Sequence, residues 1–269
     1  MSGRSGYQVS DDAARNRERY SVRYFLGPWV PGLVAMAALQ PGERVLDLAC
    51  GSGIVARAAA AAVGPTGRVT GLDISQAMLA MARSLPPPPG APITWVEGDA
   101  GAMDFPGAAF DAIACQQGLQ FFPDKLSAVR EMRRVLAPSG RAVVSVWKSA
   151  GPYNVAVAQA LERHVGAETA AKYRASRVVP DADALYRLFV EAAFRAVEVR
   201  ASALTLRLPS IETFVLGHLS GMPIAGAVAA LSTEQRAALA SEVKATLKPY
   251  ADGDGVAVPD EVNVAVAHA

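Results

Sequence analysis

Short hydrophobic runs alternate with amphipathic stretches in the first half of this chain, between residues 44 and 147. Apolar runs bounded by turn residues predict buried strands, whereas apolar positions repeated at helical spacing predict helices that cover a sheet. The predicted strands are 44–49, 68–73, 92–97, 111–115 and 141–147, and the predicted helices are 54–62, 76–83 and 124–136. This alternation favours a doubly wound α/β fold, in which a mostly parallel sheet carries helices on both faces.

The segments on either side of this core follow other patterns. The segment 11–39 begins with charged residues and ends with apolar ones, which predicts two helices that meet at a turn at Gly27-Pro28. Residues 11–40 would thus form a helical lid. Beyond the core, the pattern predicts helices at 154–164 and 183–193, a strand-rich stretch at 197–208, a helical insertion at 211–250 and an antiparallel C-terminal strand. We therefore expect a single domain over residues 1–269, with a Rossmann-like core at 44–147 and a helical cap at 211–250.

Composition and charge narrow the classes of function. A formal net charge of +1 gives no electrostatic reason to expect a nucleic-acid partner. The polar N-terminus has no apolar leader, so we expect a cytoplasmic protein. The uncharged run 214–231 contains a histidine, a proline and several glycines, which favours cap helices over a membrane span. The two cysteines, Cys50 and Cys115, follow predicted strands, and we expect two small reduced residues rather than a redox pair.

The stretch VLDLACGSGIVA, residues 45–56, ends the first predicted strand in a glycine loop. Such a loop lets the backbone approach a ligand, and its spacing also fits a dinucleotide cofactor. Asp73 ends the second strand and is placed to accept hydrogen bonds from a ribose. Two further features distinguish the ligands: Asp47 lies within the first strand, and Asp99 and Ala100 follow the third strand, where a carboxylate could accept the amine of an adenine.

This combination resembles the class I S-adenosylmethionine-dependent methyltransferases. The motifs that carry the resemblance are VLDLACGSG, GLDIS, GDA, FDAIACQQGLQFFPD and VREMRRVLAPSG, and they cover residues 44–147. The segment RYSVRYFLGPWV and the late insertion resemble the branch that contains the ubiquinone and menaquinone C-methyltransferases. Ala49 replaces a glycine that many members have, and its methyl group is small enough to permit the turn.

The resemblance implies S-adenosyl-L-methionine as cofactor and S-adenosyl-L-homocysteine as product, and it implies a role for each site residue. Gly51 and Gly53 would let the backbone approach the methionine part, and Asp73 would hold the ribose. The other implied contacts are Ile74 and Met78 on one face of the adenine, Asp99 and Ala100 at its edge, and Gln116 at the methionine end, while Asp47 and Ala49 also belong to the site.

Methyl transfer from a sulfonium is an in-line displacement, for which holding the reactants in position can supply much of the acceleration. A base is needed only when the acceptor must lose a proton, and His218, in the apolar insertion, is the candidate. The more ordinary interpretation of His218 is a cap residue bonded to the backbone. The predicted acceptor pocket consists of Tyr20, Tyr24, Trp29, Gln120, Phe121 and His218. Packing of helices explains these aromatic residues equally well.

The sequence therefore predicts an enzyme that methylates a small, partly apolar organic acceptor at an oxygen, nitrogen or carbon atom. No Asn/Asp-Pro-Pro-Tyr motif follows the fourth strand, and no acidic cluster follows Trp147, so we expect neither a nucleic-acid substrate nor a metal. One alternative is a protein that binds the same cofactor without transferring methyl, as a sensor or partner subunit. Another is an NAD-dependent reductase. The oligomeric state, monomer or homodimer, is left open.

Overall fold

The computed structural model describes residues 9–269, and its centre is an eight-stranded sheet. The strands are β1 Arg44–Leu48, β2 Arg68–Asp73, β3 Ile93–Glu97, β4 Phe110–Gln116, β5 Leu136–Trp147, β6 Arg195–Leu208, β7 Ala251–Asp252 and β8 Gly255–His268. Their order is β3-β2-β1-β4-β5-β8-β6, with β7 paired to β8. The first five strands are parallel, whereas β8 is antiparallel to both of its neighbours, β5 and β6. The predicted sheet and its antiparallel C-terminal strand are confirmed.

Neighbouring residues of the parallel strands pack into cores on opposite faces of the sheet. Val45 contributes to the core under α3, Ile54–Val63, whereas Leu46 contributes to the core under α5, Lys125–Val135, and α8, Ala182–Glu191. This alternation buries both faces, so most positions of the central strands are apolar. Asp47 of β1 is one polar exception, and only 1% of it is exposed. The helix α4, Gln76–Ser84, packs against β2 and β3.

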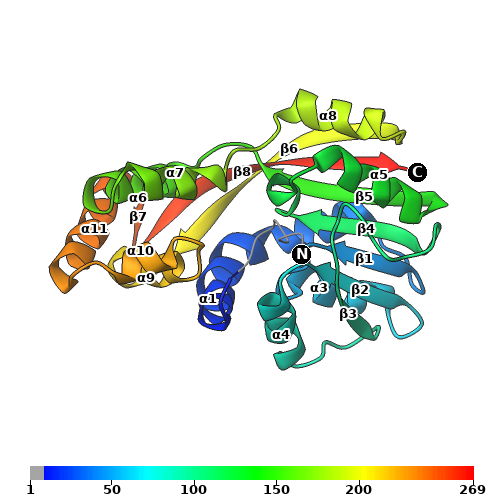
Figure 1. Cartoon of the computed structure of the whole chain (residues 1–269), viewed down its shortest axis with the longest axis horizontal. Helices are drawn as coiled ribbons and strands as arrows, with labels where there is room; N and C mark the ends of the chain where they lie inside the picture. The colour runs from blue at the N-terminus through cyan, green and yellow to red at the C-terminus, as the bar shows by residue number, and fades with distance from the viewer. Residues whose placement is uncertain (1–8) are drawn as a thin grey trace, which may run out of the picture.

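The cap is built from two separate segments of the chain, of which only the second was predicted as cap. The second segment contains α9 Ile211–Ser220, α10 Ala225–Ala229, α11 Thr233–Thr246 and the short η4 Lys248–Tyr250. The first contains α6 Pro152–His164 and α7 Ala167–Ala175. Helix α6 packs against α11, which also packs against α9. The long strands β6 and β8 extend from the sheet to these helices (Figure 1), so they form an arm that carries the cap.

The N-terminal segment is helical without the predicted turn between two helices. It runs through α1 Asp11–Asn16, the π-helical η1 Arg17–Leu26, the 3-10 turn η2 Gly27–Trp29 and α2 Val30–Ala37. The Gly27 N–H bonds to the carbonyl oxygen of Val22, five residues earlier, which is the π-helical pattern. Pro28 lies in the first turn of the next helical element, where a backbone N–H would have no hydrogen-bond partner within the helix. At Gly27-Pro28 the wide π-helical turn thus changes to a narrower 3-10 turn, and the helical segment continues into α2.

Gly217 of α9 and Gly221, which directly follows α9, allow the N-terminal helix to lie close against the cap. A Cβ atom at Gly217 would lie 2.2 Å from the Tyr20 ring, and one at Gly221 would lie 2.6 Å from the backbone nitrogen of Arg17. The helix η1 consequently contacts both the cap and the sheet, and its buried Phe25 belongs to the same apolar cluster as the cap. Among the described residues, no helix has the length and apolar character that crossing a membrane requires. The prediction about a leader concerns residues 1–8, which lie outside the described residues.

Candidate functional site

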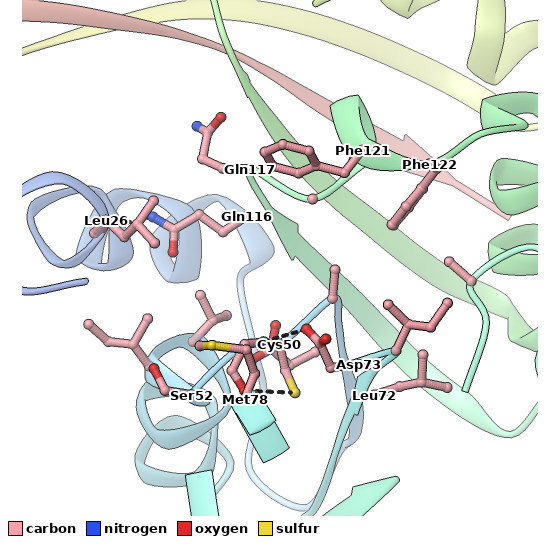
Figure 2. Close-up of a pocket in the computed structure, with 18 of the residues that line it drawn as sticks. Leu26, Cys50, Ser52, Leu72, Asp73, Met78, Gln116, Gln117, Phe121 and Phe122 are labelled. Carbon is pink, nitrogen blue, oxygen red and sulfur yellow. Dashed lines mark hydrogen bonds between the residues drawn. The ribbon is translucent and has the colours of Figure 1, made fainter. Parts of the chain in front are cut away.

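A pocket lies at the carboxyl ends of β1, β2 and β4, where the chain turns from each strand toward a helix (Figure 2). Its empty volume, including the part open to solvent, is about 960 Å³. The residues predicted to contact the cofactor line this pocket, with the exception of Gly53: Asp47, Ala49, Gly51, Asp73, Ile74, Met78, Asp99, Ala100 and Gln116. The structure thus gathers side chains from four strand ends into one space. The individual roles of these residues stay predictions.

The glycine loop after β1 turns sharply because three of its residues have left-handed backbone angles. Their φ values are 57° at Ala49, 55° at Gly51 and 85° at Gly53. Ala49 adopts this angle with a side chain, at a cost of roughly 1–2 kcal/mol for an L-residue. Its methyl group lies against Gly118, where a Cβ atom would come within 2.6 Å. Gly118, which the sequence analysis did not select, therefore makes room for the replacement of glycine by Ala49.

Gly53 faces away from the pocket and toward Trp95 of β3. A Cβ atom at this position would lie 2.1 Å from the Trp95 ring. We expect Gly53→Ala to lower the free energy of unfolding by at least about 1–2 kcal/mol, the cost of a left-handed L-residue. Urea denaturation measures this loss. The control is Gly32→Ala in α2, where nothing lies within 4 Å of the added atom and alanine is the better helix former. Equal stability of the two variants would contradict the prediction.

Asp73 holds the glycine loop and the start of α4 together. One of its carboxylate oxygens accepts the Gly51 N–H and the other accepts the Ser75 N–H, both at 2.8 Å. Ser75, not Asp73, is the N-cap residue of α4, because its Oγ accepts the Met78 N–H. Burial raises the pKa of Asp73, and its backbone hydrogen bonds oppose that rise. The carboxyl group is therefore kept at the mouth of the loop, where a ligand's hydroxyl groups can reach it.

Asp47 lies deeper, on β1, and supports the other end of the loop. Its Oδ2 accepts the Ala56 N–H of α3 at 2.8 Å. Burial raises the pKa of Asp47 to about 8, and the nearby Asp73 adds to the rise. A ligand that brings positive charge into this space would therefore favour the ionised form of the carboxyl group.

Gln116 ends β4 on the same side of the pocket as the N-terminal helix. Its Nε2 donates to the carbonyl oxygen of Leu26 at 2.8 Å, so the side chain ties the sheet to η1 (Figure 2). Asp99 accepts the Gly101 N–H at 2.8 Å and lines the pocket from the loop after β3. The wall opposite the glycine loop is thus formed by residues far apart in sequence.

A second pocket adjoins the first and reaches under the cap. The two share Arg17, Leu26, Gln117 and Phe121 as lining residues. Of the predicted acceptor residues, Gln120, Phe121 and His218 line the second pocket, whereas Tyr20, Tyr24 and Trp29 do not line either pocket. Tyr20 and Tyr24 pack edge-on against Phe214 of α9, and Trp29 packs against Trp147. These three aromatic residues join helices, which is the alternative that the sequence left open.

His218 is held by Tyr153 of α6, with 3.0 Å between the phenol oxygen and Nδ1. Burial raises the pKa of Tyr153 well above its usual value, so the phenol keeps its proton near pH 7. Burial, with Arg17 and Arg177 nearby, lowers the pKa of His218 to about 3. His218 is therefore neutral near pH 7 and a weak base.

We expect the His218 ring to show no titration between pH 5 and pH 8, because its pKa lies far below that window. Proton NMR of the imidazole resonances measures this directly. The variant His218→Asn identifies the resonance among those of the three histidines. A His218 signal with a midpoint near 6.5 would show that water reaches the ring, and it would restore the general-base interpretation.

Several residues of the two pockets escaped the sequence analysis. Arg17 and Leu26 come from the N-terminal helix, Gln117 follows Gln116, and Arg177 follows α7. Gln117 had a usable signal, because it continues a strand whose end was already assigned to the site. No sequence signal pointed to Arg177, because its position depends on contacts between segments that are far apart in the chain. Among residues 9–269, no cluster of three or more metal-type side chains is present.

Comparisons with known proteins agree with this geometry. A family model described as a methyltransferase domain matches residues 45–140. The 2-phytyl-1,4-naphtoquinone methyltransferase of Synechococcus elongatus is 42% identical over 118 residues, which are 43% of this chain and 51% of that protein. The ubiquinone/menaquinone biosynthesis C-methyltransferase UbiE of Burkholderia vietnamiensis is 34% identical over 181 residues, which are 63% of this chain and 74% of that protein. The chain thus spans between half and three quarters of the length of these relatives.

Solved structures share the fold at low sequence identity. Phosphoethanolamine N-methyltransferase 2 of Haemonchus contortus, in complex with S-adenosyl-L-methionine, is 19% identical with a TM-score of 0.60, covering 96% of this chain and 57% of that one. The YcgJ protein of Bacillus subtilis is 17% identical with a TM-score of 0.58, covering 90% and 98%. These two matches show the shared fold. The identity to UbiE, over 74% of its length, and the methyltransferase family model decide the family. The chain belongs to the class I S-adenosylmethionine-dependent methyltransferases.

Proposed function

We propose that this protein transfers a methyl group from S-adenosylmethionine to a small, partly apolar organic acceptor. The observation that carries the proposal is the pair of adjoining pockets: one holds two buried carboxyl groups beside a glycine loop, and the other lies under the cap. The names of the quinone methyltransferase relatives support an acceptor of small-molecule size. When bound, the cofactor supplies a methyl group on a sulfonium, which is already a good leaving group.

The residues of this chain would bind and orient the two reactants. Asp73 would accept the ribose hydroxyl groups, and Asp99 would accept the adenine amine, with Met78 packed against the ring. The helix η1 would cover the pocket through Leu26 and exclude water. Such positioning is worth roughly 7–11 kcal/mol in favourable intramolecular reactions, so no base has to act on an acceptor that is already nucleophilic.

The proposal has a direct test with the purified chain. Incubation with methyl-labelled S-adenosylmethionine and a panel of small acceptors should give labelled product together with S-adenosylhomocysteine. Tight binding of S-adenosylmethionine without turnover on any acceptor would favour the alternative of a non-methylating protein. The fold permits that alternative, because the [4+2]-cyclase SpnF shares it with a TM-score of 0.50 and 19% identity. Binding of NADH and not of S-adenosylmethionine would favour a reductase.

We also propose that the lid, core and cap act as one domain in the cytoplasm, without a nucleic-acid partner. The continuous apolar cluster through η1 and the cap supports the first point, and the net charge of +1 supports the last. Fractionation of cells that express the full chain would test the location.

A further inference from the structure

The second pocket combines aromatic walls with an unusual number of polar side chains. Phe25, Phe121 and Trp147 contribute flat apolar surface. The Phe25 ring stacks on His218, with 4.9 Å between the ring centroids and 30° between the ring planes, so the two rings form one packed aromatic pair in the wall of the pocket. The empty volume of the pocket, including the part open to solvent, is about 450 Å³. Its walls thus suit one or two planar rings.

Three polar side chains of this pocket carry buried atoms without a hydrogen-bond partner. They are the Ser21 hydroxyl, the Gln117 Oε1 atom and both amide atoms of Gln120. Ser21 and Gln117 are each 4% exposed. Buried polar atoms in folded proteins nearly always have partners, so such atoms gathered around one cavity point to a ligand that completes them.

Gln117 is also fixed in position by strain and by hydrogen bonds. Its φ of 53° is uncommon for a residue other than glycine, and strained residues of this kind gather at binding sites. The Gln117 backbone N–H donates to the Ser145 carbonyl oxygen at 2.9 Å, and its Nε2 contacts the Ser145 Oγ at 3.5 Å. The amide nitrogen is therefore turned toward β5, and its oxygen is the atom that remains for a ligand.

The charged groups of this pocket are positive. Arg17 and Arg177 line it, and no carboxylate belongs to its lining. Asp260 lies behind Arg177 and accepts from both of its terminal nitrogens at 2.9 Å, which holds the guanidinium in place. His218 is neutral near pH 7 and lines the same pocket. Asp260 offsets the charge of Arg177, but the lining side chains themselves include cations and no anion, so the pocket favours an acidic or electron-rich group over a cationic one.

We propose that the acceptor is a small planar hydroxyaryl carboxylate without a long isoprenoid tail. This inference rests on the proposed function, since it names the substrate class of the same site. The ring would lie against Phe25 and His218, its acidic group would face the arginines, and its hydroxyl or carbonyl groups would pair with Ser21, Gln117 and Gln120. An isoprenoid tail in this pocket would instead cover these polar atoms without offering them hydrogen-bond partners. The names of the quinone relatives therefore do not extend to the acceptor of this chain.

The test is isothermal titration calorimetry on the full chain, first with S-adenosylhomocysteine and then with candidate acceptors added to that complex. The probes are a hydroxybenzoate, a hydroxynaphthoate, the methyl ester of each, and a farnesylated naphthoquinol. We expect an acid to bind at least about tenfold more tightly than its ester and than the tailed quinol. Gln120→Leu should weaken binding of the acid by about tenfold and leave the affinity for S-adenosylhomocysteine within twofold.

Gln159→Leu is the matched control, because Gln159 is exposed on α6, and both affinities should stay unchanged. If S-adenosylhomocysteine does not bind, the proposed function fails. If it binds, and the acids bind no better than their esters or the tailed quinol, or Gln120→Leu leaves their affinity unaltered, only the inference about the acceptor fails. Absence of binding by every acid to the S-adenosylhomocysteine complex also overturns this inference.

Discussion

The variant Asp260→Ala is expected to lose about 3–5 kcal/mol of unfolding free energy, because it leaves the Arg177 guanidinium charged and unpaired in the interior. The two side chains are only 7% and 2% exposed. The guanidinium carbon also lies 3.7 Å from the centre of the Trp147 ring, so the arginine cannot turn toward water without losing that contact. Urea denaturation at neutral pH measures the loss.

The neighbouring residue provides the control. Glu261 pairs with Lys148, but both side chains are about 40% exposed, and such surface pairs contribute about 0–1 kcal/mol. Glu261→Ala should therefore have a small effect. A double variant, Asp260→Leu with Arg177→Met, should recover part of the lost stability, since replacing both partners of a buried pair removes the unpaired charge. A loss below about 1 kcal/mol in Asp260→Ala would show that water solvates Arg177.

The variant Asp73→Ala should weaken the binding of S-adenosylhomocysteine by about 1.5–3 kcal/mol, the range for hydrogen bonds to a charged group. This corresponds to a roughly 10- to 150-fold increase in Kd. The physical reason is twofold: the carboxylate is placed to accept the ribose hydroxyl groups, and it also fixes the Gly51 N–H beside the ligand. Isothermal titration calorimetry gives the dissociation constant.

Two further variants separate these contributions. Asp254→Ala, at an exposed turn before β8, controls for a general effect of charge and should leave Kd unchanged. Asp73→Asn keeps one acceptor oxygen, which can hold either the loop or the ligand, so its Kd should lie between those of the wild type and the alanine variant. An unaltered Kd in Asp73→Ala would remove this residue from the cofactor site.

The core of the fold could be predicted because its signals are local. The strands from Arg44 to Trp147 are apolar runs with turn residues at their ends, and the observed bounds differ from the predicted ones by at most one residue, except that β5 begins at Leu136. The carboxyl ends of parallel strands lie along one edge of the sheet. The sequence therefore predicts that Asp47, Asp73 and Asp99 belong to one site. Ser75 as N-cap of α4 required only the local sequence.

The cap and the acceptor side could not be predicted in the same way. Helix α7 has apolar residues without a clear stripe, and it is stable because it packs on α6. Its place beside the site depends on contacts between segments far apart in the chain, as does the pairing of Arg177 with Asp260. The π-helical stretch escaped prediction for a related reason, since η1 packs against α9 and β6, which lie far from it in the chain.

The loop that the arm of β6 and β8 carries contributes His218 and Met222 to the second pocket and no lining residue to the first pocket. The family model covers residues 45–140, which lie entirely on the sheet side of this arm. Exchange of the loop carried by the arm, residues 211–250, would therefore leave every lining residue of the first pocket in place. Such a graft would have to preserve Gly217 and Gly221, because only a bare backbone there lets the first helix dock. Chimeras designed across this junction are thus a practical route to new acceptors.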